Sequence, residues 1–177
     1  MTNESSRVFF ALWPDDAVRA ALAALAGEVA RETGGRPPAQ SNVHLTLAFL
    51  GEQPARRVDA LLDLASSLGG TRFALSLDEI GCFRRSGVAW LGASAPQPDL
   101  LALQMDLALA LRHDGFPVDE RPYTPHLTLA RRIRAPIHRN LTKPIVWAVS
   151  SFALVASELG GKAPTYRTLA DWPLASS

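Results

Sequence analysis

The sequence predicts a fold of mixed helices and strands that is built from two diverged copies of one unit. One observation is a succession of elements that occurs twice: strand, proline, helix, glycine, proline-containing loop and strand. Another is that both copies end on the same tetrapeptide, HLTL, once at His44 and again at His126. Because paired halves can bring equivalent residues to face each other, we expect both tetrapeptides to border one central groove.

Each element of the first copy has a local signal. The opening strand is rich in aromatic and β-branched residues, and Pro14 followed by two aspartates supplies the start of a helix. Glycine pairs end both helices, and the strand that carries His44 closes at Gly51. The expected elements are a strand over residues 7–13, a helix over 17–32, a loop over 36–42, a strand over 43–50 and a helix over 54–68.

The second copy follows the same logic. Two strand-like segments flank the turn GCFRRSG and predict a hairpin, and a Leu- and Ala-rich helix then ends at Gly115. The expected elements are strands over residues 73–80 and 88–91, a helix over 99–113, a strand over 126–130, and closing strands over 146–157 and 165–172.

Composition excludes several classes of protein. The chain has 177 residues, 47% of them hydrophobic, and a formal net charge of +1, which excludes collagen-like, coiled-coil and disordered chains and does not favour a general nucleic-acid coat. No apolar run is long enough to span a membrane, and the N-terminus lacks the pattern of a signal peptide, so a cytoplasmic protein is expected. A single cysteine, Cys82, excludes a disulfide framework and is expected to be a packing residue.

One stretch is locally basic. Residues 131–143 carry five Lys or Arg side chains and no acid. A solvated surface and a patch that faces phosphate are both open interpretations of such a run.

The two HLTL segments carry the strongest functional signal. Side chains alternate across a strand, so His44 and Thr46 share one face, while the leucines and Phe49 are expected on the core face. The second segment repeats this pattern with His126 and Thr128. A half-buried strand histidine satisfied by its neighbours would explain one such segment, but a repeated pair indicates function.

Two histidines that face one groove suit a displacement at phosphorus. Imidazole titrates near pH ~6.5, so one ring can accept a proton from the attacking oxygen while the other protonates the leaving oxygen. The threonine hydroxyls can donate to the phosphate oxygens. A metal-assisted hydrolysis is the rival, but the motif offers no carboxylate and no third ligand. His113 is expected at a helix end and His138 on the surface.

The chain resembles the two-histidine phosphoesterases, specifically the bacterial and archaeal RNA 2',3'-cyclic phosphodiesterases that are also described as 2'-5' RNA ligases. The resemblance is carried by VFFALWP, HLTLAFLGE, GCFRRSGVAWLG, PYTPHLTLAR and YRTLADWPL, which span nearly the whole chain. It implies a bilobal α+β fold with two pseudo-symmetric halves, each with a mainly antiparallel sheet, around an active groove. Residues 1–177 are therefore expected to form a single two-lobed phosphoesterase domain.

The resemblance also implies a reaction: hydrolysis of a terminal 2',3'-cyclic phosphate to a 2'-phosphomonoester, without metal or cofactor. His44 would be the proton donor and His126 the proton acceptor, with Thr46 and Thr128 on the phosphate.

Arg131 resembles the family's phosphate-contacting arginine, which requires the strand to end or bulge near Ala130. Phe83 is expected to bind the substrate base. Phe49 could do so as well, although its place in the alternation favours the core.

The expected partners are RNA ends or cyclic nucleotides bearing a 2',3'-cyclic phosphate, with no membrane and no obligate protein partner. The alternative function is an RNA-end-binding or 2'-5' RNA ligase-type module with little hydrolytic turnover, and small cyclic nucleotides are an alternative substrate.

Overall fold

The computed structural model describes residues 5–158 and 164–176, and these form one antiparallel sheet with three α-helices. The strand order is β6-β3-β4-β5-β2-β1-β7-β8. The strands are β1 (Ser5–Leu12), β2 (Leu45–Pro54), β3 (Phe73–Phe83), β4 (Val88–Gly92), β5 (Leu127–Arg131), β6 (Arg139–Val149), β7 (Ser151–Glu158) and β8 (Thr165–Pro173). The helices are α1 (Asp16–Thr33), α2 (Ala55–Ser66) and α3 (Pro98–His113), with a 3₁₀ turn over Gln40–Asn42.

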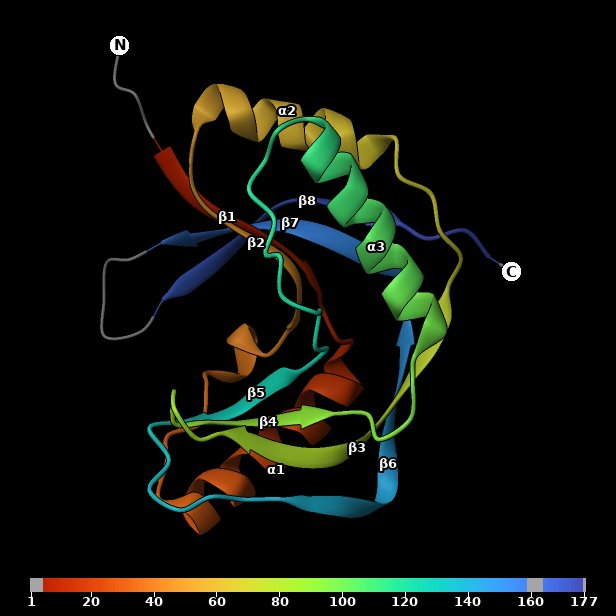
Figure 1. Ribbon diagram of the computed structural model, residues 1–177. Coiled ribbons are helices and arrows are strands. Elements are labelled where there is room, and N and C mark those ends of the chain that lie inside the picture. Colours follow the sequence, from red (N-terminus) through yellow and green to blue (C-terminus); the bar gives the residue numbers. More distant parts are fainter. Residues whose placement is uncertain (1–4, 159–163, 177) are drawn as a thin grey trace.

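The sheet consists of two four-stranded halves that meet at a single point. The first half is β2-β1-β7-β8 and the second half is β5-β4-β3-β6. Strands β2 and β5 pair only through Leu45 and Leu127, the equivalent leucines of the two HLTL segments. Figure 1 shows the two halves one above the other, with the chain crossing between them. The expected α+β fold with two antiparallel, pseudo-symmetric halves is therefore confirmed.

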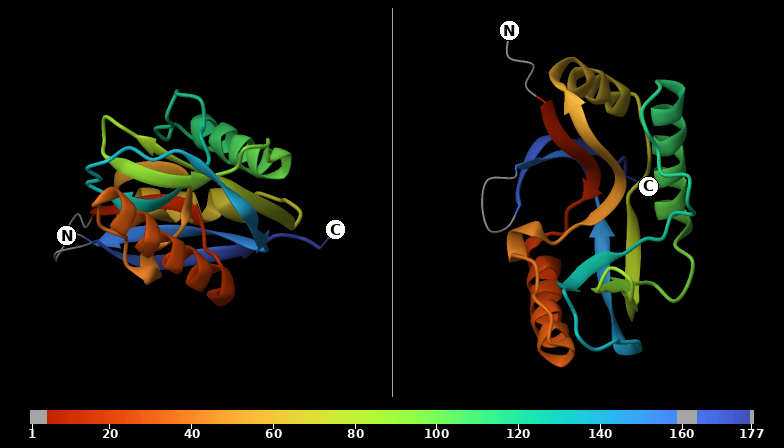
Figure 2. Two further views of the ribbon diagram at one scale, coloured as in Figure 1. Left: turned by 90° about the horizontal axis from the view of Figure 1, so that it is seen from below. Right: turned by 60° about the vertical axis from the view of Figure 1, so that its left-hand side comes forward.

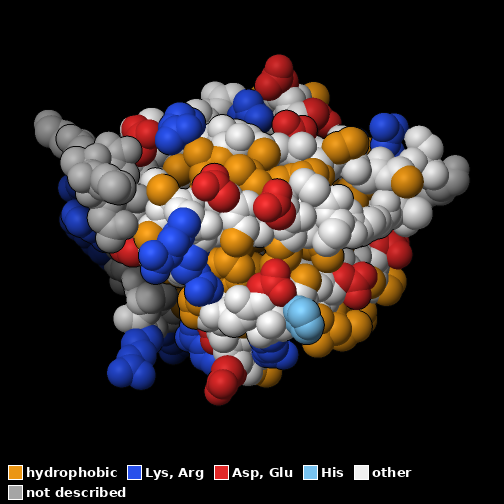
Figure 3. All heavy atoms as spheres, turned by 90° about the horizontal axis from the view of Figure 1, so that it is seen from above, with side chains coloured by type: hydrophobic (Ala, Val, Ile, Leu, Met, Phe, Trp, Pro, Cys, Tyr) orange, Lys and Arg blue, Asp and Glu red, His pale blue; other side chains and the backbone are white. Residues whose placement is uncertain are grey.

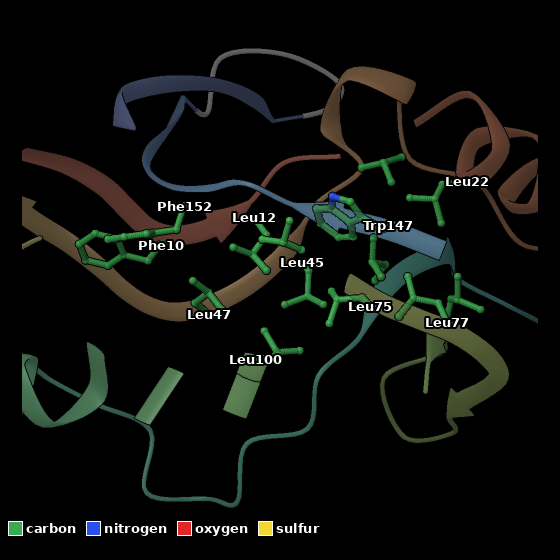
Figure 4. Packing of buried hydrophobic residues seen from close by; sticks show 14 of the residues in the cluster. Phe10, Leu12, Leu22, Leu45, Leu47, Leu75, Leu77, Leu100, Trp147 and Phe152 are labelled. Carbon is green, nitrogen blue, oxygen red and sulfur yellow. The ribbon is translucent and has the colours of Figure 1, made fainter. Parts of the chain in front are cut away.

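Two helices cross from one half to the other. Helix α1 follows β1 of the first half but packs on β5 and β6 of the second, and α3 follows β4 but contacts β2 as well as β3. The views in Figure 2 show α1 beside the second half and α3 beside α2. Because these helices contact the opposite half, the two halves share a core, and buried residues from both form one cluster. Figure 4 shows part of it, with Leu12 and Leu47 near Leu75 and Trp147.

The predicted start and end of the first helix are confirmed in detail. The Asp15 side chain accepts a hydrogen bond of 2.8 Å from the backbone N–H of Val18, a cap that typically contributes about 1 kcal/mol. Gly34 ends the helix with φ +66°, a left-handed conformation that glycine adopts without steric cost.

Several predicted boundaries shift by two or three residues, and two differ more. The strand that carries His44 does not close at Gly51, because this glycine, at φ +68°, lies where the pairing of β1 and β2 shifts register, and pairing resumes as far as Pro54. The single strand expected over residues 146–157 is two strands, β6 and β7, separated by Ser150. The apolar run continues across this reversal, so hydrophobicity alone did not mark it.

Among the described residues, no helix has the length and apolarity needed to cross a bilayer.

Candidate active site

The two HLTL segments occupy equivalent positions where the halves meet. Their leucines are 0–2% exposed and belong to the core. The histidines and threonines lie on the opposite face, where one cavity of about 680 Å³ is bordered by His44, Thr46, His126 and Thr128. The expected groove, with a histidine from each half, is therefore present.

Each segment contains an irregularity after its threonine. In the pairing of β1 with β2, Ala11 faces Thr46 and Phe10 faces Ala48, so Leu47 is the extra residue. In the pairing of β4 with β5, the partners of consecutive residues on β4 are Thr128 and Ala130, so Leu129 is the extra residue. Both bulges fall on the fourth residue of HLTL and change which face the following residues occupy.

The bulge in β5 explains the position of Arg131. Regular alternation would have put this side chain on the core face, but Leu129 and Ala130 are both buried and Arg131 borders the cavity. The bulge that the resemblance required near Ala130 is thus present.

The bulge in β2 corrects the expectation for Phe49. Its ring was expected in the core, yet it is 50% exposed and borders the cavity. The alternation from Leu45 to Phe49 fails because Leu47 and Ala48 interrupt it. Phe49 and Arg131 are consequently equivalent positions, five residues after His44 and His126, with an aromatic ring in one half and a guanidinium in the other.

Both imidazoles are held by the same backbone contact. Nδ1 of His44 is 2.7 Å from the carbonyl oxygen of Asn42, and Nδ1 of His126 is 2.7 Å from that of Thr124. A carbonyl oxygen only accepts, so each Nδ1 carries a proton and Nε2 is the nitrogen that remains for a substrate.

His44 is enclosed by aromatic side chains. The ring centroids of Phe9, Trp13 and Tyr166 lie 5.0, 5.4 and 5.2 Å from that of His44. Its Nε2 is 3.0 Å from Oγ1 of Thr46, which donates to it when the ring is neutral. Burial lowers the pKa of His44, and the Asn42 carbonyl opposes this by stabilising the charged ring. The positive charges of Arg131 and His126 lower that pKa further.

His126 has a more open setting. Phe83 packs edge-on against it with a centroid separation of 5.0 Å, and Trp90 lies behind Phe83 at 5.7 Å. Phe83, predicted to bind the base, is not among the residues that border the cavity. It contacts the imidazole of His126.

One hydrogen bond ties the loop before the second motif to the strand of the first. The hydroxyl of Tyr123 donates to the carbonyl oxygen of Thr46 at 2.8 Å. Burial raises the pKa of Tyr123, so the hydroxyl keeps its proton and remains a donor. This contact links the two motifs where the halves of the sheet share only one residue pair.

The basic stretch 131–143 divides into two parts. Arg131 and Arg132 border the cavity, whereas Arg139 forms ion pairs with Glu28 and Glu32 of α1. Arg139 thus fits the interpretation as a solvated surface, and a phosphate-facing role for Arg131 and Arg132 stays a prediction. His138 is on the surface near Glu79, as expected.

Two further residues, His113 and Cys82, lie outside the cavity. His113 lies at the exposed end of α3 beside Asp114, as expected. Cys82 is partly buried against the core. Among the described residues, no group of three or more His, Cys, Asp or Glu side chains is placed to hold a metal ion.

Several cavity residues were missed by sequence reasoning. Arg7 and Phe9 lie on β1, and alternation along that strand could have placed Phe9 beside the groove. Arg36 comes from the loop after α1, and no sequence signal connects it to Arg131. Tyr166 lies in the last strand, within the YRTLADWPL segment.

Comparisons with known proteins agree with this geometry. A family model for the 2'-5' RNA ligase superfamily matches residues 14–161. The RNA 2',3'-cyclic phosphodiesterase of Escherichia coli (strain K12) is 34% identical over 175 residues, covering 97% of this chain and 98% of that protein. The protein of the same name from Thermus thermophilus is 34% identical over 185 residues, covering 95% and 90%.

Solved structures give the same result. The crystal structure of E. coli LigT in apo form superposes with a TM-score of 0.88 at 34% identity, covering 97% of this chain and 99% of that one. The structure of E. coli LigT complexed with 3'-AMP gives a TM-score of 0.85 at 33% identity with the same coverage. Since the family model matches most of the chain and these relatives align over nearly all of it, the protein belongs to the 2'-5' RNA ligase superfamily.

Proposed function

We propose that this protein is an RNA 2',3'-cyclic phosphodiesterase that opens a terminal cyclic phosphate to a 2'-phosphomonoester. The observation that carries the proposal is the pair of imidazoles, which come from the equivalent positions directly before β2 and β5 and border one cavity together with Arg131. The relatives from E. coli and T. thermophilus bear the name of this activity.

The reaction needs two proton transfers at opposite ends of an in-line displacement. His126 accepts a proton from water at Nε2 as the water oxygen bonds to phosphorus. The bond between phosphorus and the 3' oxygen breaks, and His44 donates its Nε2 proton to that oxygen. Water is thereby added across the bond, which leaves a 2'-phosphate and a free 3' hydroxyl. Each transfer typically contributes 10²- to 10⁴-fold in rate.

The remaining residues stabilise the phosphate. Thr46 and Thr128, which border the cavity, donate hydroxyl hydrogen bonds to its non-bridging oxygens, and Arg131 supplies a positive charge. The bound phosphate has a further effect on His44. Its negative charge favours the protonated imidazole and offsets the repulsion from Arg131 that lowers the pKa of His44 in the free protein.

Phe49 is the residue best placed to stack on the terminal base. Its exposed ring borders the cavity, and the Arg7 guanidinium lies 4.9 Å from the ring centroid. Bases at RNA ends commonly stack on such aromatic side chains.

The decisive experiment uses an RNA oligomer that ends in a 2',3'-cyclic phosphate, incubated with and without EDTA. Complete conversion to the 2'-phosphate in both conditions is expected, because the proposed chemistry uses no metal. A 3'-phosphate product, or activity destroyed by EDTA and restored by manganese, would overturn the proposal.

An RNA-end-binding or ligase-type module is the second candidate, because the cluster of arginines in the cavity would serve it equally well. Tight binding of the same oligomer with negligible turnover would favour this module. The single two-lobed domain over residues 1–177, the cytoplasmic location and the lack of a protein partner stay predictions.

A further inference from the structure

The cavity carries more positive charge than one cyclic phosphate requires. No Asp or Glu is among the described residues that border it. Four arginines do so: Arg7, Arg36, Arg131 and Arg132. A cyclic phosphodiester brings a single negative charge. On the side seen from above in Figure 3, by comparison, acidic and basic side chains both occur among hydrophobic ones.

These four arginines differ from some of the others in having no acidic partner. Within the part of the chain that the structure describes, none of the four forms an ion pair, whereas Arg19, Arg121, Arg139 and Arg167 each contact a carboxylate. No carboxylate in the described part of the chain neutralises these cavity charges, so they are available to a bound anion.

Arg36 and Arg131 are held directly opposite each other. The backbone N–H of each donates to the carbonyl oxygen of the other, at 2.8 and 2.9 Å, so the two residues form an isolated antiparallel bridge. Side chains of such a pair project from the same face, and like charges in this position are destabilising. An anion between or beside the two guanidinium groups removes that repulsion.

The backbone of Arg132, the next residue, is conformationally strained. It has φ +55°, and it is the only non-glycine residue with positive φ among those described. Hydrogen bonds on its C-terminal side hold this turn, from Ile133 N–H to the Gly87 carbonyl and from Arg134 N–H to the Thr33 carbonyl. Strained backbone of this kind concentrates at functional sites, and here it accompanies a side chain that borders the cavity.

We propose that Arg36 and Arg132 bind the phosphodiester on the 5' side of the terminal nucleotide, so the protein selects RNA strands over cyclic mononucleotides. Arg131 holds the reacting phosphate, and Arg36 beside it and Arg132 next along the chain receive the following one. This inference rests on the proposed function and names the substrate class of the same site.

The test compares three substrates in kcat/KM. They are 2',3'-cyclic AMP, an adenylyl dinucleotide ending in a 2',3'-cyclic phosphate, and the same dinucleotide with an uncharged methylphosphonate linkage. The wild-type protein is expected to prefer the charged dinucleotide to its uncharged analogue by about tenfold, the lower range for a hydrogen bond to a charged group. The slope of log kcat/KM against log salt should be steeper by roughly 0.7 for the charged form.

Two variants and a control isolate the contact. Arg36→Gln keeps the backbone bridge, and Arg132→Asn keeps a residue that tolerates positive φ, so both are expected to fold. Each should reduce the preference for the charged linkage by threefold or more. Arg56→Gln removes the same charge from α2, away from the cavity, and should leave the preference unchanged.

The outcomes separate this inference from the proposed function. If the wild-type protein hydrolyses both dinucleotides equally well, or if both variants retain the full preference, the inference is wrong. It is equally wrong if the variants lose activity to the same extent on the cyclic mononucleotide, because Arg36 and Arg132 would then act at the reacting phosphate. Hydrolysis of none of the three substrates would instead reject the proposed function.

Discussion

The strands around His44 and His126 share a tetrapeptide, a bulge at its fourth residue and a backbone carbonyl that holds Nδ1, yet the two histidines have different surroundings. His44 lies among three aromatic rings and bonds to Thr46, whereas His126 meets one ring, that of Phe83. The same backbone geometry thus presents two imidazoles in unequal dielectric environments.

This difference bears on how one sequence motif can serve two opposite roles. An acid and a base cannot be told apart by identical tetrapeptides, so neighbouring strands must make them unequal. In the first half the aromatic wall comes from β1, the residue that follows it and β8, and in the second half the contact comes from β3. The equivalent positions Phe49 and Arg131 differ in the same way, with an aromatic ring proposed to bind the base in one half and a guanidinium proposed to bind the phosphate in the other.

The largest effect is expected from removing either imidazole. His44→Ala and His126→Ala should each lower kcat for a cyclic-phosphate RNA end by about 10²- to 10⁴-fold, because each removes one proton transfer. Circular dichroism should show an unchanged fold. His113→Ala and His138→Ala, at exposed sites outside the cavity, are the matched controls. Near-normal turnover by either of the first two variants would contradict the assignment of one proton transfer to each histidine.

The threonines provide the next test. Thr46→Val and Thr128→Val remove a hydroxyl while keeping the shape of the side chain, and each is expected to lower kcat by about 10²-fold if it stabilises the transition state. A rise in KM with kcat unchanged would mean that the hydroxyl binds substrate and transition state equally. Single-turnover kinetics on the same RNA end measure the chemical step directly.

A smaller effect is expected at the contact between the motifs. Tyr123→Phe leaves the Thr46 carbonyl without its donor and should lower the free energy of unfolding by about 1–3 kcal/mol. Urea denaturation checks this value. Unchanged stability would show that the hydroxyl does not hold the two motifs together.

The smallest effect concerns protonation. The imidazole of His44 should titrate below pH ~6.5 in the free protein, because burial disfavours its charged form. Arg131→Gln should raise this pKa, since it removes a positive charge that lowers it. Both values can be read from NMR titration of the ring. A pKa of His44 at or above that of a free histidine would remove the proposed inequality.

The same shift has a consequence for stability. The folded pKa of His44 lies below the unfolded one, so the unfolded chain binds more protons as pH falls. The contribution of the neutral ring is therefore present above pH ~6.5 and is lost as pH falls through the folded pKa. His44→Gln should reduce this loss, as denaturation at several pH values would reveal.

Much of the local structure and both motifs could be predicted from the amino-acid sequence. Helix α1 has its cap at Asp15 and its end at Gly34 because short-range hydrogen bonding and backbone freedom act over a few residues. The repeated HLTL, with leucines toward the core, was sufficient to predict two strands and a shared groove, since side-chain alternation is a property of any strand.

Other features of the site depend on contacts between segments that are distant in the sequence. The bulges at Leu47 and Leu129 arise from pairing with neighbouring strands, and they bring Phe49 and Arg131 to the cavity against the pattern of the sequence. Arg36 reaches the site only because the loop after α1 bridges to Arg131. The inequality of the two histidines likewise depends on rings from distant segments, because desolvation is set by everything that packs around a group.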